Sequence, residues 1–357
     1  MTTLFARALL AWFDLHGRHD LPWQRPRDAY RVWVSEIMLQ QTQVATVVPY
    51  FGRFMAALPT LEALAHASEE QVMGLWSGLG YYRRARHLHQ AARICLRDHA
   101  GELPRDFDQL AALPGIGRST AGAILAQAHG LRFPILDGNA KRVLARHGGI
   151  DGWPGESAVQ KQLWALAEAY TPSRRIADYT QAIMDLGATV CLRSSPRCAD
   201  CPVRGDCVAL RDGRTAELPA RRPATVKPQR ETCMLLLVDG DGRVLLQRRS
   251  DIGLWPGLWS LPEAVRDEVP ACVRGLAVTR GIHRQELPSF VHVFSHFRLH
   301  VTPLLWRGVA ARAVVADNDD LRWCAPDQWQ ALGLPAPVRR LLQAIEPEAS
   351  CHEPSTA

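Results

Sequence analysis

Lysine is scarce in this chain. Only three of its 42 basic residues are lysines, namely Lys141, Lys161 and Lys227, and the others are arginines. Chemistry in which a side-chain amine forms a covalent bond to the substrate therefore has very few candidate nucleophiles. Arginine suits bidentate contacts with phosphate, although genome base composition also produces such a skew. The scarcity of lysine is thus more informative about mechanism than about the partner.

Long hydrophobic runs are also absent. No apolar stretch approaches the roughly 20 residues that a membrane-spanning helix needs. Residues 1–8 lack the basic region, apolar stretch and cleavage site of a signal peptide, so we expect a helix there. The composition, 47% hydrophobic and 22% charged, is typical of a globular protein with a sizeable core. We therefore expect no association with a membrane.

The charge balance favours an anionic partner. The formal net charge is +6 and the pI is about 9.0, which indicates nucleic acid first. Charge alone leaves open the alternative of a basic soluble protein without such a partner.

No disulfide framework is evident, yet the chain has nine cysteines. Four of them form a C-x6-C-x2-C-x5-C run at Cys191, Cys198, Cys201 and Cys207. Four soft thiolates suit a zinc ion or an iron–sulfur cluster. Structural zinc sites usually pair two short knuckles, whereas only one gap is short here. The spacing alone leaves both metals open. We interpret the remaining five as buried or unpaired thiols in a protein of the reducing cytoplasm: Cys95, Cys233, Cys272, Cys324 and Cys351.

The length of 357 residues predicts two to three domains. Residues 1–211 show apolar residues at helical spacing between Pro and Gly breakers, which predicts an all-α domain. Residues 212–230 are polar and contain prolines, as expected of a linker. Residues 231–347 include two apolar runs around a Gly/Asp turn at 239–242, which predicts a hairpin and an α+β domain. Residues 348–357 are expected to be a loose tail.

A second glycine-rich feature lies between two helical stretches. Leu113-Pro114-Gly115-Ile116-Gly117 precedes a segment that begins at Arg118. Gly115 and Gly117 would let backbone N–H groups approach a phosphate at the positive end of the next helix. An ordinary connection between two helices has the same composition, and the motif alone does not decide between them.

Several longer motifs carry a family resemblance. They are Leu21-Pro22-Trp23-Gln24, residues 34–44, Gly78-Leu79-Gly80-Tyr81-Tyr82, residues 135–139 with Lys141-Arg142-Val143, and Met184-Asp185-Leu186-Gly187. Together with the hairpin and the cysteine run, they resemble the adenine DNA glycosylase (MutY) family over essentially the whole chain. The resemblance implies an all-α helix-hairpin-helix glycosylase domain with an iron–sulfur cluster loop, plus an α+β Nudix-like C-terminal domain. It divides the first domain into a six-helix part, 29–130, and a cluster-bearing part, 1–28 with 131–211.

The resemblance also implies the reaction and its partner. A monofunctional enzyme would hydrolyse the N-glycosidic bond of adenine that is mispaired with 8-oxoguanine or guanine in double-stranded DNA. The four clustered cysteines would hold a [4Fe–4S] cluster. We expect such a protein to be a cytoplasmic monomer.

Two carboxylates carry the implied chemistry. Glu36 sits among Val34, Ile37 and Met38, and an apolar setting raises a carboxyl pKa, so this group can act as a general acid. On chemistry alone a solvated surface glutamate is the more usual reading; the resemblance makes Glu36 the residue that protonates adenine. Asp137 also suits a turn before a helix. By resemblance Asp137 stabilises positive charge on the sugar, with Asn139 and Ser119 beside it.

A base inside a duplex must be flipped out before it can react. The resemblance gives Gln41 and Tyr81 as residues that wedge beside the opposing base, with Thr42 and Leu79 nearby. The arginines that follow are equally compatible with phosphate contacts and with a solvated helix face: Arg83, Arg84 and Arg86.

The C-terminal domain resembles the Nudix fold without its metal-binding box. A pyrophosphate hydrolase of that fold carries an Arg-Glu…Glu-Glu helix, whereas this chain reads Glu263–Pro270 there, and the proline should interrupt a helix. We expect recognition and not hydrolysis. Ser295 and His296 match the loop that contacts 8-oxoguanine in the family, although His296 alone would also suit a satisfied position at a strand end.

Two further functions remain as alternatives. One is a bifunctional glycosylase/lyase similar to endonuclease III, which carries a nucleophilic lysine where Ser119 stands here. The other is a non-enzymatic, zinc-bearing DNA-binding module, which would leave the Glu36 and Asp137 motifs without a role.

Overall fold

The computed structural model describes residues 2–223, 226–312, 315 and 318–345. The chain forms two compact units. Unit 1 comprises Met1–Ala67 and Arg83–Ala224, and unit 2 comprises Ser68–Tyr82 and Thr225–Ala357. These boundaries differ from those expected from the sequence, because residues 68–82 belong to unit 2 and unit 1 extends into the expected linker. The expected tail, 348–357, lies outside the described residues.

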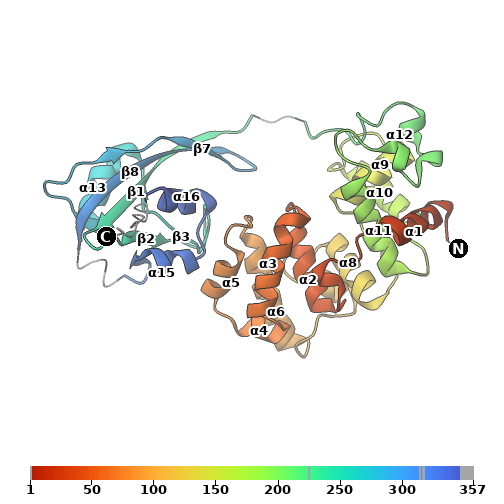
Figure 1. Ribbon diagram of the computed structural model, residues 1–357, viewed down its shortest axis with the longest axis horizontal. Coiled ribbons are helices and arrows are strands. Elements are labelled where there is room, and N and C mark those ends of the chain that lie inside the picture. Colours follow the sequence, from red (N-terminus) through yellow and green to blue (C-terminus); the bar gives the residue numbers. More distant parts are fainter. Residues whose placement is uncertain (1, 224–225, 313–314, 316–317, 346–357) are drawn as a thin grey trace, which may run out of the picture. The chain divides into compact units, whose positions relative to one another are not determined.

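Unit 1 is helical throughout its described part, as the sequence predicts. Its helices are α1 (Leu4–His16), η1 (Pro22–Gln24), α2 (Ala29–Leu39), α3 (Val44–Ala57), α4 (Leu61–His66), α6 (Arg83–Asp98), α7 (Phe107–Ala112), α8 (Arg118–His129), α9 (Gly138–Gly148), α10 (Ser157–Tyr170), α11 (Ile176–Thr189), η2 (Cys198–Asp200), η3 (Arg204–Asp206) and α12 (Val208–Arg211). Helix α8 packs against both α2 and α11 and so joins the two groups of helices within the unit (Figure 1).

Side-chain caps and an apolar core explain this helical order. Thr3, Asp28, Thr60 and Asp106 each accept a hydrogen bond from a backbone N–H in the first turn of the helix that follows. The core that supports α9 is formed by apolar residues of α1, α9, α10 and α11, among them Leu9, which is completely buried. The first turn of α9 is thus built on a packed base.

The expected linker is partly an ordered extension of unit 1. Leu218 is buried, and its carbonyl accepts a hydrogen bond from Arg146 Nε on α9 at 2.9 Å. Ala220 N donates to the carbonyl of Gly152 at 3.2 Å. Burial of this apolar side chain removes apolar surface from water and, with these hydrogen bonds, holds the stretch against unit 1.

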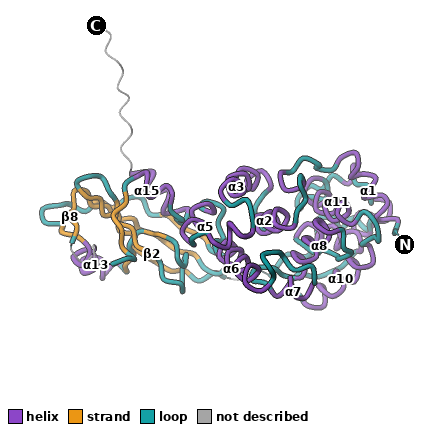
Figure 2. Tube along the Cα trace, turned by 90° about the horizontal axis from the view of Figure 1, so that it is seen from below, coloured by secondary structure: helices purple, strands orange, loops and turns teal. Residues whose placement is uncertain are grey.

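Unit 2 is built around a mixed sheet with helices on both faces (Figure 1). Its elements are α5 (Glu69–Trp76), β1 (Gln229–Asp239), β2 (Val244–Arg248), β3 (Trp259–Ser260), β4 (Glu263–Ala264), η4 (Arg266–Glu268), α13 (Val269–Leu276), β5 (Ala277–Val278), β6 (Gln285–Glu286), β7 (Phe290–Val293), β8 (Arg298–Ala311), β9 (Leu321–Cys324), α15 (Pro326–Ala331) and α16 (Ala336–Ile345). Strands β1 and β8 pair in parallel, and β2 pairs antiparallel with β1, as expected of the hairpin. Among the described residues, the strands all belong to this unit (Figure 2).

The alternation along β1 separates two apolar cores. Met234 and Leu236 face a core that includes residues of α15 and α16, while Leu235 and Leu237 face a core that includes residues of α13. Because successive strand side chains point to opposite faces, a continuous apolar run indicates a sheet that is covered on both sides.

The stretch at Glu263–Pro270 corrects one expectation. Pro270 does not interrupt a helix but lies in the first turn of α13, where its missing N–H costs no hydrogen bond. The acidic residues before it lie on β4 and the short η4 helix, and Glu263 pairs with Arg249 at 3.3 Å. These residues therefore do not form the helical metal-binding box of a pyrophosphate hydrolase.

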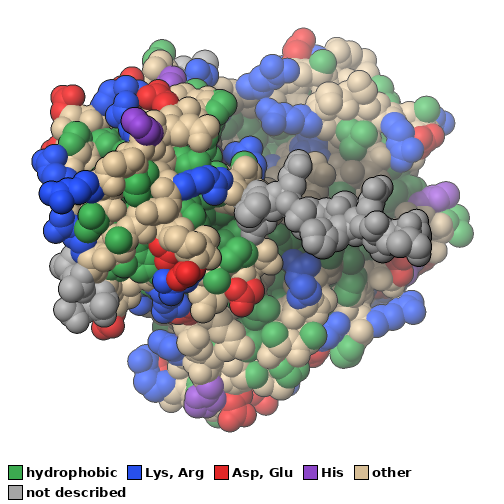
Figure 3. All heavy atoms as spheres, turned by 60° about the vertical axis from the view of Figure 1, so that its left-hand side comes forward, with side chains coloured by type: hydrophobic (Ala, Val, Ile, Leu, Met, Phe, Trp, Pro, Cys, Tyr) green, Lys and Arg blue, Asp and Glu red, His purple; other side chains and the backbone are tan. Residues whose placement is uncertain are grey.

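No helix in the described part of the chain has the length and apolar character to cross a membrane. Basic side chains are scattered over the face shown in Figure 3, with acidic side chains between them. Charge alone therefore does not mark a binding surface on that face.

Candidate active site and cysteine cluster

Glu36 lies on α2 next to residues that form the core of unit 1. Val34, Ile37 and Met38 are buried, and Gln127 Nε2 on α8 donates a hydrogen bond to Glu36 Oε1 at 3.0 Å. Burial raises the pKa of Glu36 to about 8, the charge of Asp137 adds to the rise, and the Gln127 hydrogen bond opposes it. The group is therefore mostly protonated at neutral pH, unlike a solvated glutamate.

Asp137 is the N-cap of α9. Its Oδ1 accepts a hydrogen bond from the backbone N–H of Ala140 at 2.8 Å, so the structural reading of Asp137 as a turn residue before a helix is confirmed. Burial raises the pKa of Asp137, while backbone N–H groups of Ala140 and Asn139 and the charges of Arg142 and Lys141 oppose this rise. A cap position leaves the same carboxylate available for a second role.

The two carboxyl groups differ in the groups that surround them. Burial raises the pKa of Asp137, and its position at the positive end of α9 with two cations nearby opposes this rise. Glu36 has an amide as hydrogen-bond donor and feels the negative charge of Asp137, which favours its neutral form. Glycoside hydrolysis generally uses two carboxyl groups whose surroundings differ in this way.

Ser119 and Asn139 fix the backbone on either side of Asp137. Ser119 Oγ accepts a hydrogen bond from Leu136 N at 2.9 Å, so α8 holds the residue before Asp137. Asn139 Oδ1 accepts from Arg142 Nη2 at 2.9 Å. Arg142 Nε also donates to the carbonyl of Cys191 at 2.7 Å, which ties the start of α9 to the cysteine segment.

Gly187 allows α11 to approach this site closely. A Cβ atom added to Gly187 would lie 2.5 Å from Cβ and 3.0 Å from Cα of Asn139. Both distances are shorter than a normal carbon–carbon contact, so a larger residue would displace the first turn of α9. The Met184–Gly187 motif thus has a steric reason for its final glycine.

Arg84 corrects the expectation for the arginines of α6. It is buried, and its Nη1 donates to the carbonyls of Ile37, Met38 and Gln40 at 2.6–2.9 Å. Its Nη2 donates to Thr42 Oγ1 at 3.2 Å. Arg84 therefore faces neither phosphate nor solvent but satisfies carbonyl groups at the end of α2, as helix ends require.

Gln41 and Thr42 follow this arginine-bound helix end. Gln41 is exposed and has a φ of 60°, a left-handed conformation that non-glycine residues rarely adopt. Thr42 is partly exposed and held by Arg84. Arg84 thus holds the residues on both sides of Gln41.

The Gly78–Tyr82 segment belongs to unit 2 and is also strained. Tyr81 is 55% exposed and has a φ of 50°, while Leu79 is buried. Tyr81 therefore presents a large aromatic surface to solvent, whereas Leu79 serves packing in this structure.

The Leu113–Gly117 hairpin forms a tight turn in front of α8. Ile116 N donates to the carbonyl of Leu113 at 3.1 Å, and Ile116 is buried. Gly115 has a φ of 78°, and a Cβ there would lie 2.8 Å from Cβ of His87. Gly117 caps α8 without a side chain, so exposed backbone surrounds the helix start.

Ser295 and His296 lie in the exposed turn between β7 and β8. Ser295 Oγ is 3.3 Å from His296 Nδ1, and Phe294 stacks on Phe297 with ring centroids 4.4 Å apart. Lys227 Nζ donates to the Phe294 carbonyl at 2.7 Å. The stacked rings of Phe294 and Phe297 thus support a turn in which Ser295 and His296 are exposed to solvent.

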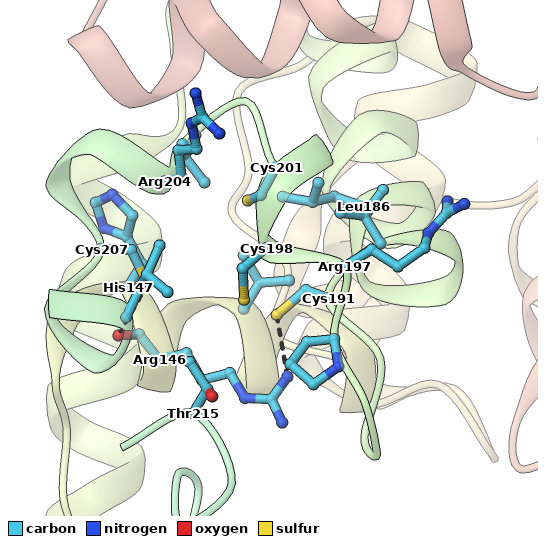
Figure 4. A pocket seen from close by; sticks show the side chains of 15 residues that line it. Arg146, His147, Leu186, Cys191, Arg197, Cys198, Cys201, Arg204, Cys207 and Thr215 are labelled. Atoms are coloured by element: carbon cyan, nitrogen blue, oxygen red, sulfur yellow. Dashed lines mark hydrogen bonds between the residues drawn. The ribbon is translucent and has the colours of Figure 1, made fainter. Parts of the chain in front are cut away.

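Cys191, Cys198, Cys201 and Cys207 line one pocket of unit 1, together with apolar residues of α9 and α11 (Figure 4). Arg146 Nη1 lies 3.4 Å from Cys191 Sγ. Within the described residues, no three His, Cys, Asp or Glu side chains form a group that could hold a single metal ion. Four cysteine thiolates around one pocket are a donor set that suits zinc or an iron–sulfur cluster.

The roles of four residues at this site were not predicted from the sequence, although three of them lie in segments named there: Gln127, Arg84, Arg142 and Gly187. Gln127 had a visible signal, since it is a lone amide directly after the apolar stretch 121–126 and is buried. A buried amide needs a partner. The backbone carbonyl groups that the two arginines bind lie more than 40 positions away, and local pattern does not reveal them.

Comparison with known proteins agrees with this geometry. Residues 34–169 match the family model of the HhH-GPD superfamily base excision DNA repair protein. Residues 233–344 match the NUDIX domain. The expected fold, an all-α domain followed by a Nudix-like α+β domain, is therefore confirmed.

Curated relatives match over nearly the full length. The adenine DNA glycosylase of Buchnera aphidicola subsp. Acyrthosiphon pisum is 35% identical over 95% of this chain and 97% of its own. The adenine DNA glycosylase of Homo sapiens is 34% identical over 96% of this chain and 74% of its own. A thermostable thymine-DNA glycosylase structure is 26% identical with a TM-score of 0.53, over 58% of this chain and 96% of its own.

Proposed function

The chain belongs to the adenine DNA glycosylase family, and we propose that it removes adenine mispaired with 8-oxoguanine or guanine in duplex DNA. The observation that carries this proposal is the setting of Glu36, where burial raises the pKa to about 8 and the charge of Asp137 adds to the rise. Adenine is a poor leaving group as an anion, so its departure needs an acid that keeps its proton at neutral pH.

The reaction divides between the two carboxyl groups. Glu36 gives its proton to a ring nitrogen of adenine while the N-glycosidic bond breaks and its electrons pass to the base. Asp137 stabilises the positive charge that develops on the sugar, directly or through a transient bond. A water molecule adds to the sugar carbon, and its proton returns to Glu36. Asn139 and Ser119 hold the backbone around Asp137 during these steps.

A base-release assay tests this function. We expect adenine release from duplexes with adenine opposite 8-oxoguanine or guanine and none from adenine opposite thymine. The DNA strand should stay intact until alkali is added, because Ser119 provides no amine for a lyase reaction. Robust strand cleavage coupled to base release would favour the endonuclease III-like alternative, and absence of adenine release would refute the proposal.

We propose a [4Fe–4S] cluster on the four cysteines. The four thiols line one pocket of unit 1, and four cysteine thiolates are the usual ligand set of such a cluster. The cysteine spacing of the family, with one short gap between longer ones, supports a cluster over zinc. Its role here is to brace the segment that Arg142 and Arg146 connect to α9.

Metal analysis checks the cluster. Protein purified without oxygen should be yellow-brown and contain about four irons per chain. Cys198→Ser should lower the iron content and the thermal stability together, whereas Cys95→Ser, outside the cluster segment, should leave the iron content unchanged. One tightly held zinc and no iron would overturn this assignment.

The DNA contacts follow from exposure and family position. We propose that Gln41, Thr42 and Tyr81 contact the bases beside the mismatch, with Leu79 as packing support, and that Gly115 and Gly117 bind backbone phosphate. Ser295 and His296 are assigned to the oxidised base opposite adenine. The protein acts as a monomer. Its thiols, free among the described residues, suit a reducing cytoplasm.

A further inference from the structure

Unit 2 incorporates a helix and a loop from outside the C-terminal half of the chain. Helix α5 and the Gly78–Tyr82 segment pack against residues 331–339. A Cβ on Gly74 would lie 2.5 Å from the Ala331 carbonyl, and a Cβ on Gly333 would lie 2.7 Å from Met73 Cβ. Glycines on both sides of the contact thus allow the backbones to approach closely.

Hydrogen bonds centre this contact on Tyr82. Tyr82 Oη donates to the Leu334 carbonyl at 2.6 Å and accepts from Gly78 N at 3.1 Å. The hydroxyl therefore closes the Gly78–Tyr82 loop on itself and ties it to the C-terminal domain. Arg339 Nη2 donates to Ser77 Oγ at 2.8 Å, which fixes the residue before the loop.

The residue beside this anchor is strained. Tyr81 has a φ of 50° and follows Gly80 at 73°. A non-glycine residue in the left-handed region persists when surrounding contacts hold it there. Tyr82 is buried with 9% exposure, whereas Tyr81 is 55% exposed. The anchored Tyr82 therefore directly follows the exposed ring of Tyr81 in the chain.

We infer that Tyr82, held by the Leu334 carbonyl, is a positioning residue that sets the conformation of Tyr81 for mismatch binding. The C-terminal domain then acts on DNA recognition in a second way, apart from the Ser295–His296 turn. This inference rests on the proposed function. It also implies that a truncation lacking residues 225–357 changes the Tyr81 loop as well as removing the recognition turn.

A double-mutant cycle tests this coupling in the full chain. Tyr82→Phe removes only the hydroxyl, and loss of its hydrogen bonds should weaken binding to an adenine:8-oxoguanine duplex by about two- to tenfold. The duplex carries a 2′-fluoro adenosine that resists cleavage. In a Tyr81→Ala background, the same change should alter binding by less than about twofold, since the residue that it positions is gone.

Tyr30→Phe is the matched control. Tyr30 Oη donates to the Leu58 carbonyl at 2.8 Å within unit 1, so this variant loses a similar bond. Tyr30→Phe should lower the melting temperature about as much as Tyr82→Phe does, but it should not change binding to the adenine:8-oxoguanine duplex. Arg339→Met provides a second anchor variant with the same expected dependence on Tyr81.

Two results would overturn the inference. One is an equal effect of Tyr82→Phe with and without the Tyr81 side chain, which would mean a general structural role. The other is unchanged binding in both anchor variants. Failure of the proposed function gives a different result, because the wild-type protein itself would then release no adenine.

Discussion

Glu36→Gln should bind the mismatched duplex nearly as well as the wild-type protein and release almost no adenine. Glutamine keeps the shape and accepts the hydrogen bond from Gln127 but has no acidic proton to donate. General acid catalysis contributes about 10²–10⁴-fold to a rate. We therefore expect the single-turnover rate of adenine release to fall by a factor in this range, measured with enzyme in excess over DNA.

The pH dependence of the wild-type protein gives an independent check. The pKa of Glu36 is raised to about 8, so the active, protonated form is lost as the pH rises through that value. Adenine release should decline above about pH 8 in the wild type, while the small residual rate of Glu36→Gln should not follow this profile. Glu263→Gln serves as control, because burial also raises the pKa of Glu263, in unit 2. If Glu36→Gln released adenine at the wild-type rate, Glu36 would not be the general acid.

The same shift has a consequence for stability. Between the ordinary value of 4.5 and about 8, the folded protein keeps a proton on Glu36 that the unfolded chain has released. Stability must then fall as the pH rises through this window, because the folded state binds more protons. Relative to the wild type, the melting temperature of Glu36→Gln should accordingly rise between pH 5 and pH 8.

The sequence predicted those parts of the site that depend on local pattern. Val34, Ile37 and Met38 around Glu36 indicated an apolar setting, and burial does raise its pKa. The Asp137-Gly138-Asn139 turn indicated a helix start, and Asp137 caps α9. In both cases the neighbours in sequence are also neighbours in space, so local pattern indicated the setting, while the catalytic roles came from the family resemblance.

Long-range contacts account for what the sequence did not predict. Arg84 was read as a surface cation because nothing near it in sequence reveals three carbonyl partners at the end of α2. The packing of residues 68–82 within unit 2 includes the contact between Tyr82 and Leu334, which lies 252 positions away. Leu218, similarly, is one apolar residue in a polar stretch, and its sequence neighbours do not reveal that it is buried.

Asp137→Asn should separate the structural role of this residue from its catalytic role. Asparagine caps helices about as well as aspartate, so α9 should keep its first turn and the fold its stability. The negative charge that stabilises the developing positive charge on the sugar is lost. We expect adenine release to fall on the order of 10³-fold, which corresponds to about 4 kcal/mol of transition-state stabilisation.

The pKa of Glu36 supplies a second measurement for this variant. The charge of Asp137 contributes to the rise of that pKa, so its removal should move the decline in activity to lower pH. Asp106→Asn is the matched control, since Asp106 caps α7 through a similar bond to Gln109 N at 2.9 Å. That variant should leave both the rate and its pH profile unchanged. If Asp137→Asn retains the wild-type rate, the residue serves only as a helix cap, and the positive charge on the sugar is stabilised by another group.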